Sequence, residues 1–523
     1  MSRQLYVILF VIGLLVPFTV SRFQNLPGYM DADYYFAGGV QLAKGNGFTE
    51  PYLWNYLDDP QGLPHPSHTY WMPLASIVAA VGMWMAGATT YAAGRLPFIL
   101  LSACIPLLTA ALAFDVSRQT RLAFVSGLLS IFSLYYAPFI PVTDNYGLFM
   151  LLGGSFLLLA PRHQKWIPFA LGVLSGLMTL SRSDGLLWLG LAGFATMWKA
   201  AKREDGTRVP FRNWVFAITP AALLTLAGYL LVMGGWHYRN YTLFGSFMTP
   251  GGGRLLWLEN YNQTFLYPAE KITPARFLAA GWSSALNGRL SALNANLGNA
   301  FAAQGGIFLF PFILVGLWKL RNEFRTRMAL TGWLILLFVM TVIFPFAGGR
   351  GSFFHAGAAF QPYWWTAAPI GLDVIIASLR KRGMFAENAY VVFQGMLVVL
   401  AALMTFYLVD LRVVGEWSTE DGIYAQVEKT FIEKGVDPQV RVIVRNPPGY
   451  YIASGRPALV LPYGDESVIL QVAKRYGAGL LVLEKDGTFD AIQALYDRPQ
   501  ESDTFIYLGE VDEAKLYLIE LED

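Results

Sequence analysis

Eleven apolar runs are the feature that most constrains the fold of this chain. The hydrocarbon core of a bilayer is about 30 Å thick, and a segment that crosses it must satisfy its own backbone hydrogen bonds. The runs therefore predict a polytopic α-helical membrane protein with about eleven transmembrane helices. They lie at residues 5–21, 96–114, 122–140, 142–160, 166–181, 185–198, 214–234, 305–318, 329–346, 361–379 and 389–409.

The basic residues between these runs set the expected topology, because cytoplasmic loops are enriched in Lys and Arg. A twelfth, shorter run at 72–88 is ambiguous, and every basic loop is cytoplasmic only if that run does not cross. We therefore expect a cytoplasmic N-terminus on a retained first helix, and juxtamembrane helices within an outer loop at 22–95. Residues after 410 are then also extracytoplasmic. The basic loop residues are Arg118, Arg121, Arg162, Lys165, Lys199, Lys202, Arg203, Arg208, Arg212, Lys319, Arg321, Arg325, Arg327, Arg380, Lys381 and Arg382.

The composition agrees with a membrane protein and argues against other classes. Hydrophobic residues make up 55% of the 523 residues, against roughly 45–50% apolar residues in soluble domains. The formal net charge is +2 and no basic run is separable from the loops, so we expect no nucleic-acid partner. The single cysteine, Cys104, excludes an internal disulfide and a cysteine-based metal site.

The character of the sequence changes after residue 410. Short apolar segments with strand character alternate there with two helix-like patterns, which indicates a small α/β domain. We therefore expect two domains, with residues 1–410 in the membrane and residues 411–523 outside it. The strand-like segments are 440–444, 458–462, 479–484, 505–510 and 515–521, and the helix-like patterns are 422–435 and 465–476.

The first polar segment after the N-terminal apolar run is PGYMDADYYF, with carboxylates at Asp31 and Asp33. Ionisable groups at a membrane boundary cost free energy and tend to mark function. An extended turn would hold both carboxylates near one cation, phosphate or sugar, whereas a helix would separate them. A hydrated loop without a function is the alternative, so the case depends on the surrounding residues.

Further polar candidates collect on the same predicted outer side of the membrane. A carboxylate there can act as a general base toward a hydroxyl, and an arginine can hold a phosphate through its planar fork of donors. Together they suit group transfer from a phosphate-linked donor embedded in the membrane. The candidates are Asp31, Asp33, His65, His68, Asp144, Arg182, Asp184, Arg239, Arg350 and His355.

Several candidates also have a purely structural interpretation. Asp144, in PVTDNYGLF, is as well placed to cap the following helix as to take part in catalysis. Arg182 and Asp184 are close enough in sequence to form a local ion pair at a short turn. His65 and His68 have the spacing of a metal pair, but the proline between them and the lack of a third nearby ligand argue against a metal site.

Taken together, these motifs resemble the GT-C superfamily of polytopic glycosyltransferases, and within it glycosyltransferase family 39 and the dolichyl-phosphate-mannose-protein mannosyltransferase-like group. MDADYYFAGGVQLAKGNGFTEPYLW is similar to that group's first outer loop, HPSHTYWMPLASIVAA to the segment after it, and VTDNYGLF to its second outer aspartate motif. TLSRSDGLLWL resembles the donor-phosphate turn, and WHYRNYTLFGSFMTPGGG the Trp-x-x-Arg-Asn element. The resemblance spans residues 1–410 and, more weakly, the C-terminal segment.

The resemblance implies a GT-C fold and an inverting transferase that moves a sugar, hexosyl or pentosyl, from a polyprenyl-phosphate donor to a glycan, lipid or protein acceptor. It places the catalytic base on Asp31, with Asp33 as its acidic companion and Asp144 as the second outer aspartate. Ala32 stands where the group commonly has a Glu, so the assignment of the base between Asp31 and Asp33 stays open.

The resemblance also implies a substrate site at the outer face, in an integral protein of a prokaryotic plasma membrane. We expect no metal or other cofactor, although the oligosaccharyltransferase branch of the superfamily uses a divalent ion. The expected partners are the lipid-linked donor, the acceptor and membrane lipid. The expected substrate-binding residues are Arg182, Asp184, His65, His68, Arg239, Asn240, Arg350 and His355.

Two other classes of function remain as alternatives. A transporter of a lipid-linked or small polar substrate would also carry ionisable groups near helix ends, but transporters favour inverted repeats and charges near the bilayer midplane. No convincing repeat is visible, and the candidate charges lie at the outer edge. A scaffold protein would not need a convergent set of carboxylates and arginines.

Overall fold

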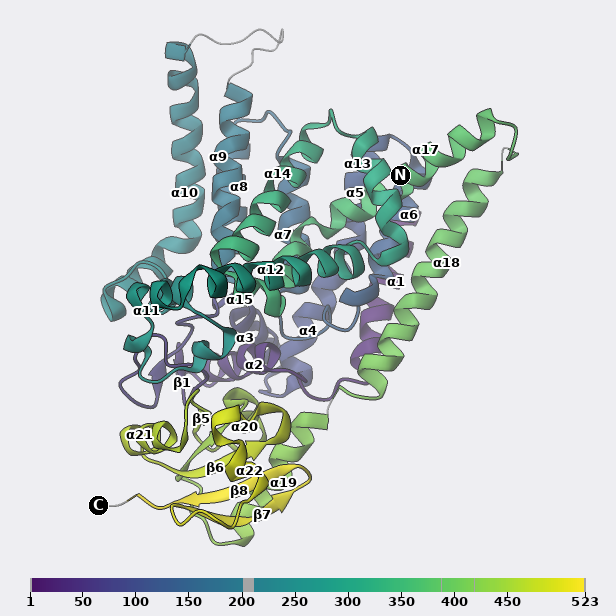
Figure 1. Cartoon of the computed structure of the whole chain (residues 1–523). Coiled ribbons are helices and arrows are strands. Elements are labelled where there is room, and N and C mark those ends of the chain that lie inside the picture. Colours follow the sequence, from purple (N-terminus) through teal and green to yellow (C-terminus); the bar gives the residue numbers. More distant parts are fainter. Residues whose placement is uncertain (1, 201–210, 387, 418, 522–523) are drawn as a thin grey trace. The chain divides into compact units, whose positions relative to one another are not determined.

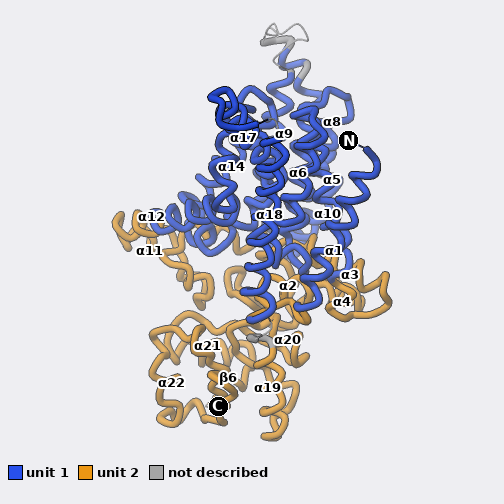
Figure 2. The backbone as a smooth tube through the Cα atoms, turned by 90° about the vertical axis from the view of Figure 1, so that its right-hand side faces the viewer, with its two compact units in different colours: residues 1–23, 95–248, 289–415 blue, residues 24–94, 249–288, 416–523 orange. Residues whose placement is uncertain are grey.

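Figure 1 shows the computed structural model, which describes residues 2–200, 211–386, 388–417 and 419–521. Three of the predicted cytoplasmic cations, Lys202, Arg203 and Arg208, lie outside the described residues. The chain forms two compact units, which Figure 2 colours separately. The first unit consists of residues 1–23, 95–248 and 289–415, and the second of residues 24–94, 249–288 and 416–523.

Each predicted apolar run contains an α-helix, which confirms the predicted helical fold class. Among the described residues, five helical segments are long and apolar enough to cross a membrane, or six if the bent pair α12 (Gly281–Asn299) and α13 is one span. The chain is therefore an integral membrane protein, while the eleven crossings and their orientation remain predictions. The helices of the apolar runs are α1 (Arg3–Ser21), α4 (Tyr91–Ser102), α5 (Ile105–Ser117), α6 (Thr120–Ile131), α7 (Tyr146–Leu159), α8 (Ile167–Ser181), α9 (Leu186–Ala200), α10 (Phe211–Phe244), α13 (Phe310–Lys319), α14 (Phe324–Phe338), α17 (Gln361–Lys381) and α18 (Ala389–Val409).

Helices α13 and α17 of the first unit pack with their backbones in contact. A Cβ atom built on Gly371 would lie only 1.9 Å from the carbonyl oxygen of Phe312, and one on Gly316 would lie 2.0 Å from that of Ala367. Only glycine allows this approach, and small residues are typical of helix contacts in membranes, where no hydrophobic effect drives association. The glycines therefore fix α13 along α17.

Three of the predicted cytoplasmic loops meet at one carboxylate of the first unit. Asp115, near the end of α5, forms ion pairs with Arg118 at 3.4 Å, with Arg162 at 2.9 Å and with Arg325. Arg325 also donates to the carbonyl oxygen of Leu157 at 3.0 Å, near the end of α7. These loops therefore lie together at one end of the helices of the first unit, which is compatible with the predicted topology.

The second unit contains the α/β fold predicted for the C-terminal segment. Its sheet has the strand order β2-β5-β4-β6-β8-β7, parallel from β2 to β6 and antiparallel beyond it. All five strands and both helices predicted after residue 410 are present, with α20 and the short α22 (Gln493–Asp497) in addition. The strands are β4 (Arg441–Val444), β5 (Ala458–Val460), β6 (Ala478–Glu484), β7 (Phe505–Val511) and β8 (Ala514–Ile519), and the helices are α19 (Thr419–Glu433), α20 (Pro447–Ser454) and α21 (Glu466–Tyr476).

The sheet also takes a strand from the first predicted outer loop, residues 22–95, which the sequence did not indicate. β2 (Tyr52–Leu53) pairs in parallel with β5, with Tyr52 opposite Ala458 and Leu53 opposite Leu459. Helices α2 (Met30–Ala43) and α3 (Leu74–Ala86) of the same loop pack against each other in this unit. The second unit therefore also contains residues that precede 411. The division into two domains at residue 410 stays a proposal.

Candidate active site

The two leading carboxylates lie on the first turn of α2, so of the two arrangements considered from sequence they have the helical one. The preceding residue, Tyr29, has extended backbone angles, and the helix begins at Met30. Asp31 and Asp33 both belong to the first turn, where the partial positive charge of the helix N-terminus favours negative side chains. Because a helix places residues two apart on different sides, Asp33 is fully buried whereas Asp31 is partly exposed.

Asp33 connects α2 to the C-terminal segment within the second unit. The side-chain nitrogen of Asn446 donates to Asp33 Oδ2 at 2.8 Å, and Asn446 Oδ1 accepts from the backbone of Gly449 at 3.2 Å, which caps α20. A Cβ atom on Gly449 would lie 3.0 Å from the same carboxylate oxygen. Asp33 therefore has the contacts of a positioning residue. Asn446 was not a candidate from sequence, because it lies 413 residues further along the chain.

A second buried carboxylate of this unit, Glu50, was also missed from the sequence. The hydroxyl of Tyr34 donates to Glu50 Oε2 at 2.7 Å and accepts from the backbone N–H of His68, also at 2.7 Å. Burial, and then the charge of Glu50, raise the pKa of Tyr34 well above its ordinary value. The tyrosine is therefore a permanent hydrogen-bond donor that fixes Glu50 beside α2.

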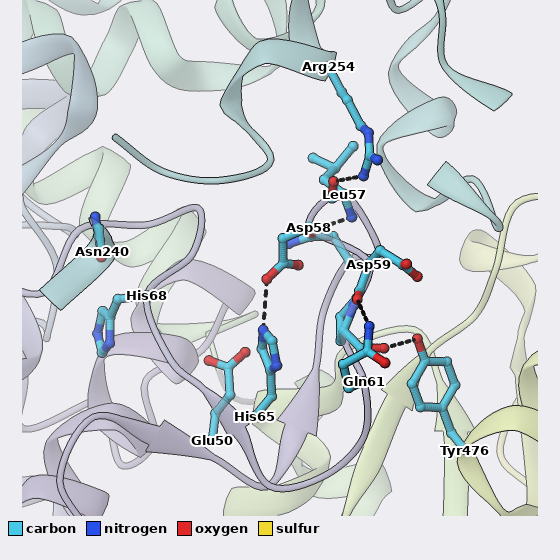
Figure 3. A network of polar contacts seen from close by, with 12 residues as sticks. Glu50, Leu57, Asp58, Asp59, Gln61, His65, His68, Asn240, Arg254 and Tyr476 are labelled. Carbon is cyan, nitrogen blue, oxygen red and sulfur yellow. Dashed lines mark hydrogen bonds and ion pairs between the residues drawn. The ribbon is translucent and has the colours of Figure 1, made fainter. Parts of the chain in front are cut away.

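The two candidate histidines of the first loop have different partners. The ring nitrogens of His68 lie 2.7 Å from Ser67 Oγ and 2.9 Å from Ser76 Oγ, and the residue is 1% exposed. His65 Nε2 lies 2.7 Å from Asp58 Oδ2, as Figure 3 shows. These contacts favour a structural part for both histidines, joining the segments of the first loop.

The loop that carries Asp58 is itself tied to other parts of the second unit. Arg254 donates to the backbone oxygen of Leu57, and the hydroxyl of Tyr476 donates to the backbone oxygen of Pro60 at 2.9 Å (Figure 3). Because Tyr476 ends α21, this contact joins the first outer loop to the C-terminal fold.

In the first unit, the structure brings Asp144 together with His355. Asp144 Oδ2 lies 3.2 Å from His355 Nε2, and Asp144 Oδ1 accepts from the backbone N–H of Asn145. Asn145, not Asp144, occupies the cap position of α7. The ring of Tyr146 stacks on His355 with centroids 4.1 Å apart, and both His355 and Asp144 are buried. The pair is thus held in a fixed geometry.

Arg350 lies just before this histidine, in a segment with irregular helical hydrogen bonding. The segment from Gly348 to Ser352 is a π-helical turn with a kink, where Gly351 has φ +118°. Such turns are frequent at functional sites. Residues 345–360 are thus a series of short helical turns, with Arg350 exposed and His355 buried.

The remaining basic candidates of the first unit form local contacts. Arg182 Nη2 lies 2.8 Å from Asp184 Oδ2, and both side chains are about 10% exposed, at 11% and 10%. The ion pair considered from sequence is therefore present. Arg239, on α10, donates to Asn240 Oδ1 at 3.1 Å, and its guanidinium lies 4.4 Å from the centre of the Trp236 ring.

Comparisons with known proteins show solved structures that have a similar fold. No family model and no curated protein sequence matches the chain. ArnT from Cupriavidus metallidurans, bound to undecaprenyl phosphate, is similar over 99% of this chain and 98% of its own, with 14% identity and a TM-score of 0.58. The Archaeoglobus fulgidus oligosaccharyltransferase is similar over 92% of this chain and 70% of its own, with 14% identity and a TM-score of 0.54.

A mycobacterial arabinofuranosyltransferase, AftD, is similar over 100% of this chain and 42% of its own, with 15% identity and a TM-score of 0.50. The archaeal oligosaccharyltransferase has also been solved in complex with Zn and sulfate. At these identities the likeness shows the fold, which is the GT-C fold that the sequence motifs resemble.

Proposed function

We propose that this protein transfers a sugar from a polyprenyl-phosphate donor to an acceptor hydroxyl at the extracytoplasmic face of the membrane. The observation that carries the proposal is the likeness to ArnT bound to undecaprenyl phosphate, because it covers nearly the whole of both chains. A likeness of that extent includes the membrane helices and the C-terminal fold together. The sugar is a hexose or a pentose, and the membrane is a prokaryotic plasma membrane.

The proposed reaction is a single displacement with inversion. The acceptor oxygen attacks the anomeric carbon while Asp31 takes its proton, and the bond from that carbon to the phosphate oxygen breaks, which releases polyprenyl phosphate. Asp31 is favoured over Asp33 as the base because it is partly exposed, whereas Asp33 is fully buried and accepts a hydrogen bond from Asn446. Asp33 then positions α2.

In the first unit, Arg182 is the proposed ligand of the donor phosphate. Its ion pair with Asp184 holds the guanidinium in one orientation, at an end of α8. Preorganised arginine donors suit phosphate, because the fork matches two oxygens at once. Asp144 and His355, with Arg239, Asn240 and Arg350, are the further substrate-site residues of this unit.

The decisive experiment incubates the purified protein with a panel of polyprenyl-phosphate sugars and an acceptor mixture, and measures released polyprenyl phosphate. Release that depends on both a particular sugar and an acceptor supports the proposal. A transporter would instead move the intact donor across a vesicle membrane without release. Movement without release across the whole panel would contradict the proposal.

A further inference from the structure

Helix α12 lies across the direction of its neighbour α13 and carries an exposed apolar stripe. The helical segments Gly281–Gln304 and Ile307–Lys319 meet at an angle of 85° (Figure 1). The second segment contains α13, which packs along α17 through its glycines. α17 has 21 residues, which is about 31 Å of helix and enough to cross the hydrocarbon core. Where α13 follows the predicted crossing of α17, a helix at 85° to α13 runs along the plane of the membrane.

One side of α12 is fixed to the protein by small and polar residues. Ala292 and Asn296 are its buried residues, and Asn296 donates to the backbone oxygen of Met340 at 3.2 Å and to Thr341 Oγ1 at 3.1 Å. These bonds prevent the helix from rolling about its axis. The sides of α12 that face outward are therefore determined.

The outward surface of α12 has an apolar sector beside a neutral polar sector. At about 100° per residue, the apolar side chains fall within roughly 80° of one another and the polar ones occupy the next 80° or so. The apolar residues are Trp282, Leu286, Leu290 and Leu297, which are 88%, 57%, 53% and 48% exposed. The polar residues are Ser283, Asn287, Ser291 and Asn294, all of them exposed.

We infer that α12 lies half-embedded in the membrane interface, with its apolar sector against lipid acyl chains and its polar sector at the headgroups. A helix with one face packed on protein, one apolar face and one hydrated face fits that position, and a large exposed tryptophan is typical of the interface. The lipid-facing surface continues onto α13, where Leu314 and Trp318 are 51% and 70% exposed. The occupant of the stripe is thus the same bilayer that surrounds α13.

This inference is independent of the proposed chemistry and can be tested without turnover. In a Cys104→Ser background, single cysteines replace Leu286 and Leu290 in the apolar sector and Asn287 and Ser291 in the polar sector. Each cysteine carries an environment-sensitive fluorophore, and the protein is reconstituted in phosphatidylcholine nanodiscs with acyl-chain spin-labelled lipid. Gln471→Cys, on an exposed position of α21, is the matched aqueous control.

Positions 286 and 290 should show blue-shifted emission and strong quenching by the labelled lipid, with weaker quenching at 287 and 291. Position 471 should show none. Quenching at 286 and 290 that is no stronger than at 471 overturns the inference, whether water, a second copy or another protein covers the stripe. A cross-link between two copies at position 286 identifies the second copy. Gel filtration of each labelled variant shows that it remains folded.

Discussion

The side-chain nitrogen of Asn446 lies 2.8 Å from Asp33 Oδ2, so a residue of the C-terminal fold holds a fully buried carboxylate on the first turn of α2. Asp31, the proposed base, belongs to the same turn. The C-terminal fold is therefore part of the support of the proposed active site. The contact with Asn446 distinguishes Asp33 from Asp31, which lies only two positions away in sequence.

Replacement of Asp31 by Asn should lower turnover by about a hundredfold or more, because it removes the proposed base while keeping size and polarity. Asp33→Asn is the matched control and should cost less, since Asp33 acts through the position of α2. The measurement is release of polyprenyl phosphate at saturating donor. Near-normal turnover for Asp31→Asn beside an inactive Asp33→Asn would exchange the two roles.

Replacement of Asn446 by Ala should destabilise the second unit, because the buried Asp33 carboxylate loses a donor. Loss of a hydrogen bond to a charged group costs about 1.5–3 kcal/mol. We expect a lower unfolding temperature and faster hydrogen exchange in α2 and α20, with a smaller loss of turnover than Asp31→Asn. Unchanged exchange in α2 would show that the contact does not hold that helix.

Replacement of Arg182 by Ala should weaken donor use by roughly ten- to a hundredfold, which corresponds to the loss of a charge-assisted contact of about 1.5–3 kcal/mol. The donor concentration that gives half-maximal turnover is the quantity to measure. Arg118→Ala is the control, because that side chain is 73% exposed and pairs with Asp115 at the opposite predicted side. If donor use is unchanged, the role of Arg182 is limited to its ion pair with Asp184.

Gln61 and Lys474 should both be accessible from outside the cell. Arg475 follows Lys474, and Asp59 lies two residues before Gln61. In the second unit Arg475 Nη2 lies 3.0 Å from Asp59 Oδ1, so the two positions belong to segments in contact. Single cysteines at 61 and 474, in a background without Cys104, should react with an impermeant reagent in intact cells. A cysteine at 162, in a predicted cytoplasmic loop, should react only after permeabilisation. The reverse pattern would invert the topology.

Transfer should continue at an unchanged rate in the presence of EDTA. Asp144 Oδ1 accepts from the backbone N–H of Asn145, and Asp144 Oδ2 lies 3.2 Å from Nε2 of His355, so each oxygen already has a polar neighbour. Turnover is measured after chelation and again after Zn, Mg or Mn is added. A loss that one of these ions restores would replace this expectation with a metal-dependent reaction.

Local pattern was sufficient for the elements, but not for their long-range partners. The apolar runs and the alternating C-terminal segments predicted helices and strands, because periodicity and length are local properties. β2 has only two residues and exists because β5 pairs with it. Helices were expected in the loop at 22–95, but whether Asp31 lies on one of them was left open, because the packing of α2 against α3 that stabilises this helix joins segments distant in sequence.

Local sequence patterns also identified candidate site residues but not their distant partners. Asp144 and Arg182 were recognisable from motifs, whereas their partners were predictable only when close in sequence, as for Asp184. His355 lies 211 residues from Asp144, and no local signal pairs the two. The burial that distinguishes Asp33 from Asp31 likewise depends on a residue far along the chain.

The parallel pairing of β2 with β5 also imposes an order on biogenesis. Tyr56, just after β2, donates to the backbone oxygen of Val460, 404 residues later. At synthesis rates of about 5–20 residues per second, roughly 20 to 80 seconds separate the emergence of the two segments. During that interval the first outer loop has already left the ribosome without its sheet. A chain whose synthesis stops before residue 458 would therefore keep an unfinished first loop, open to chaperones and proteases.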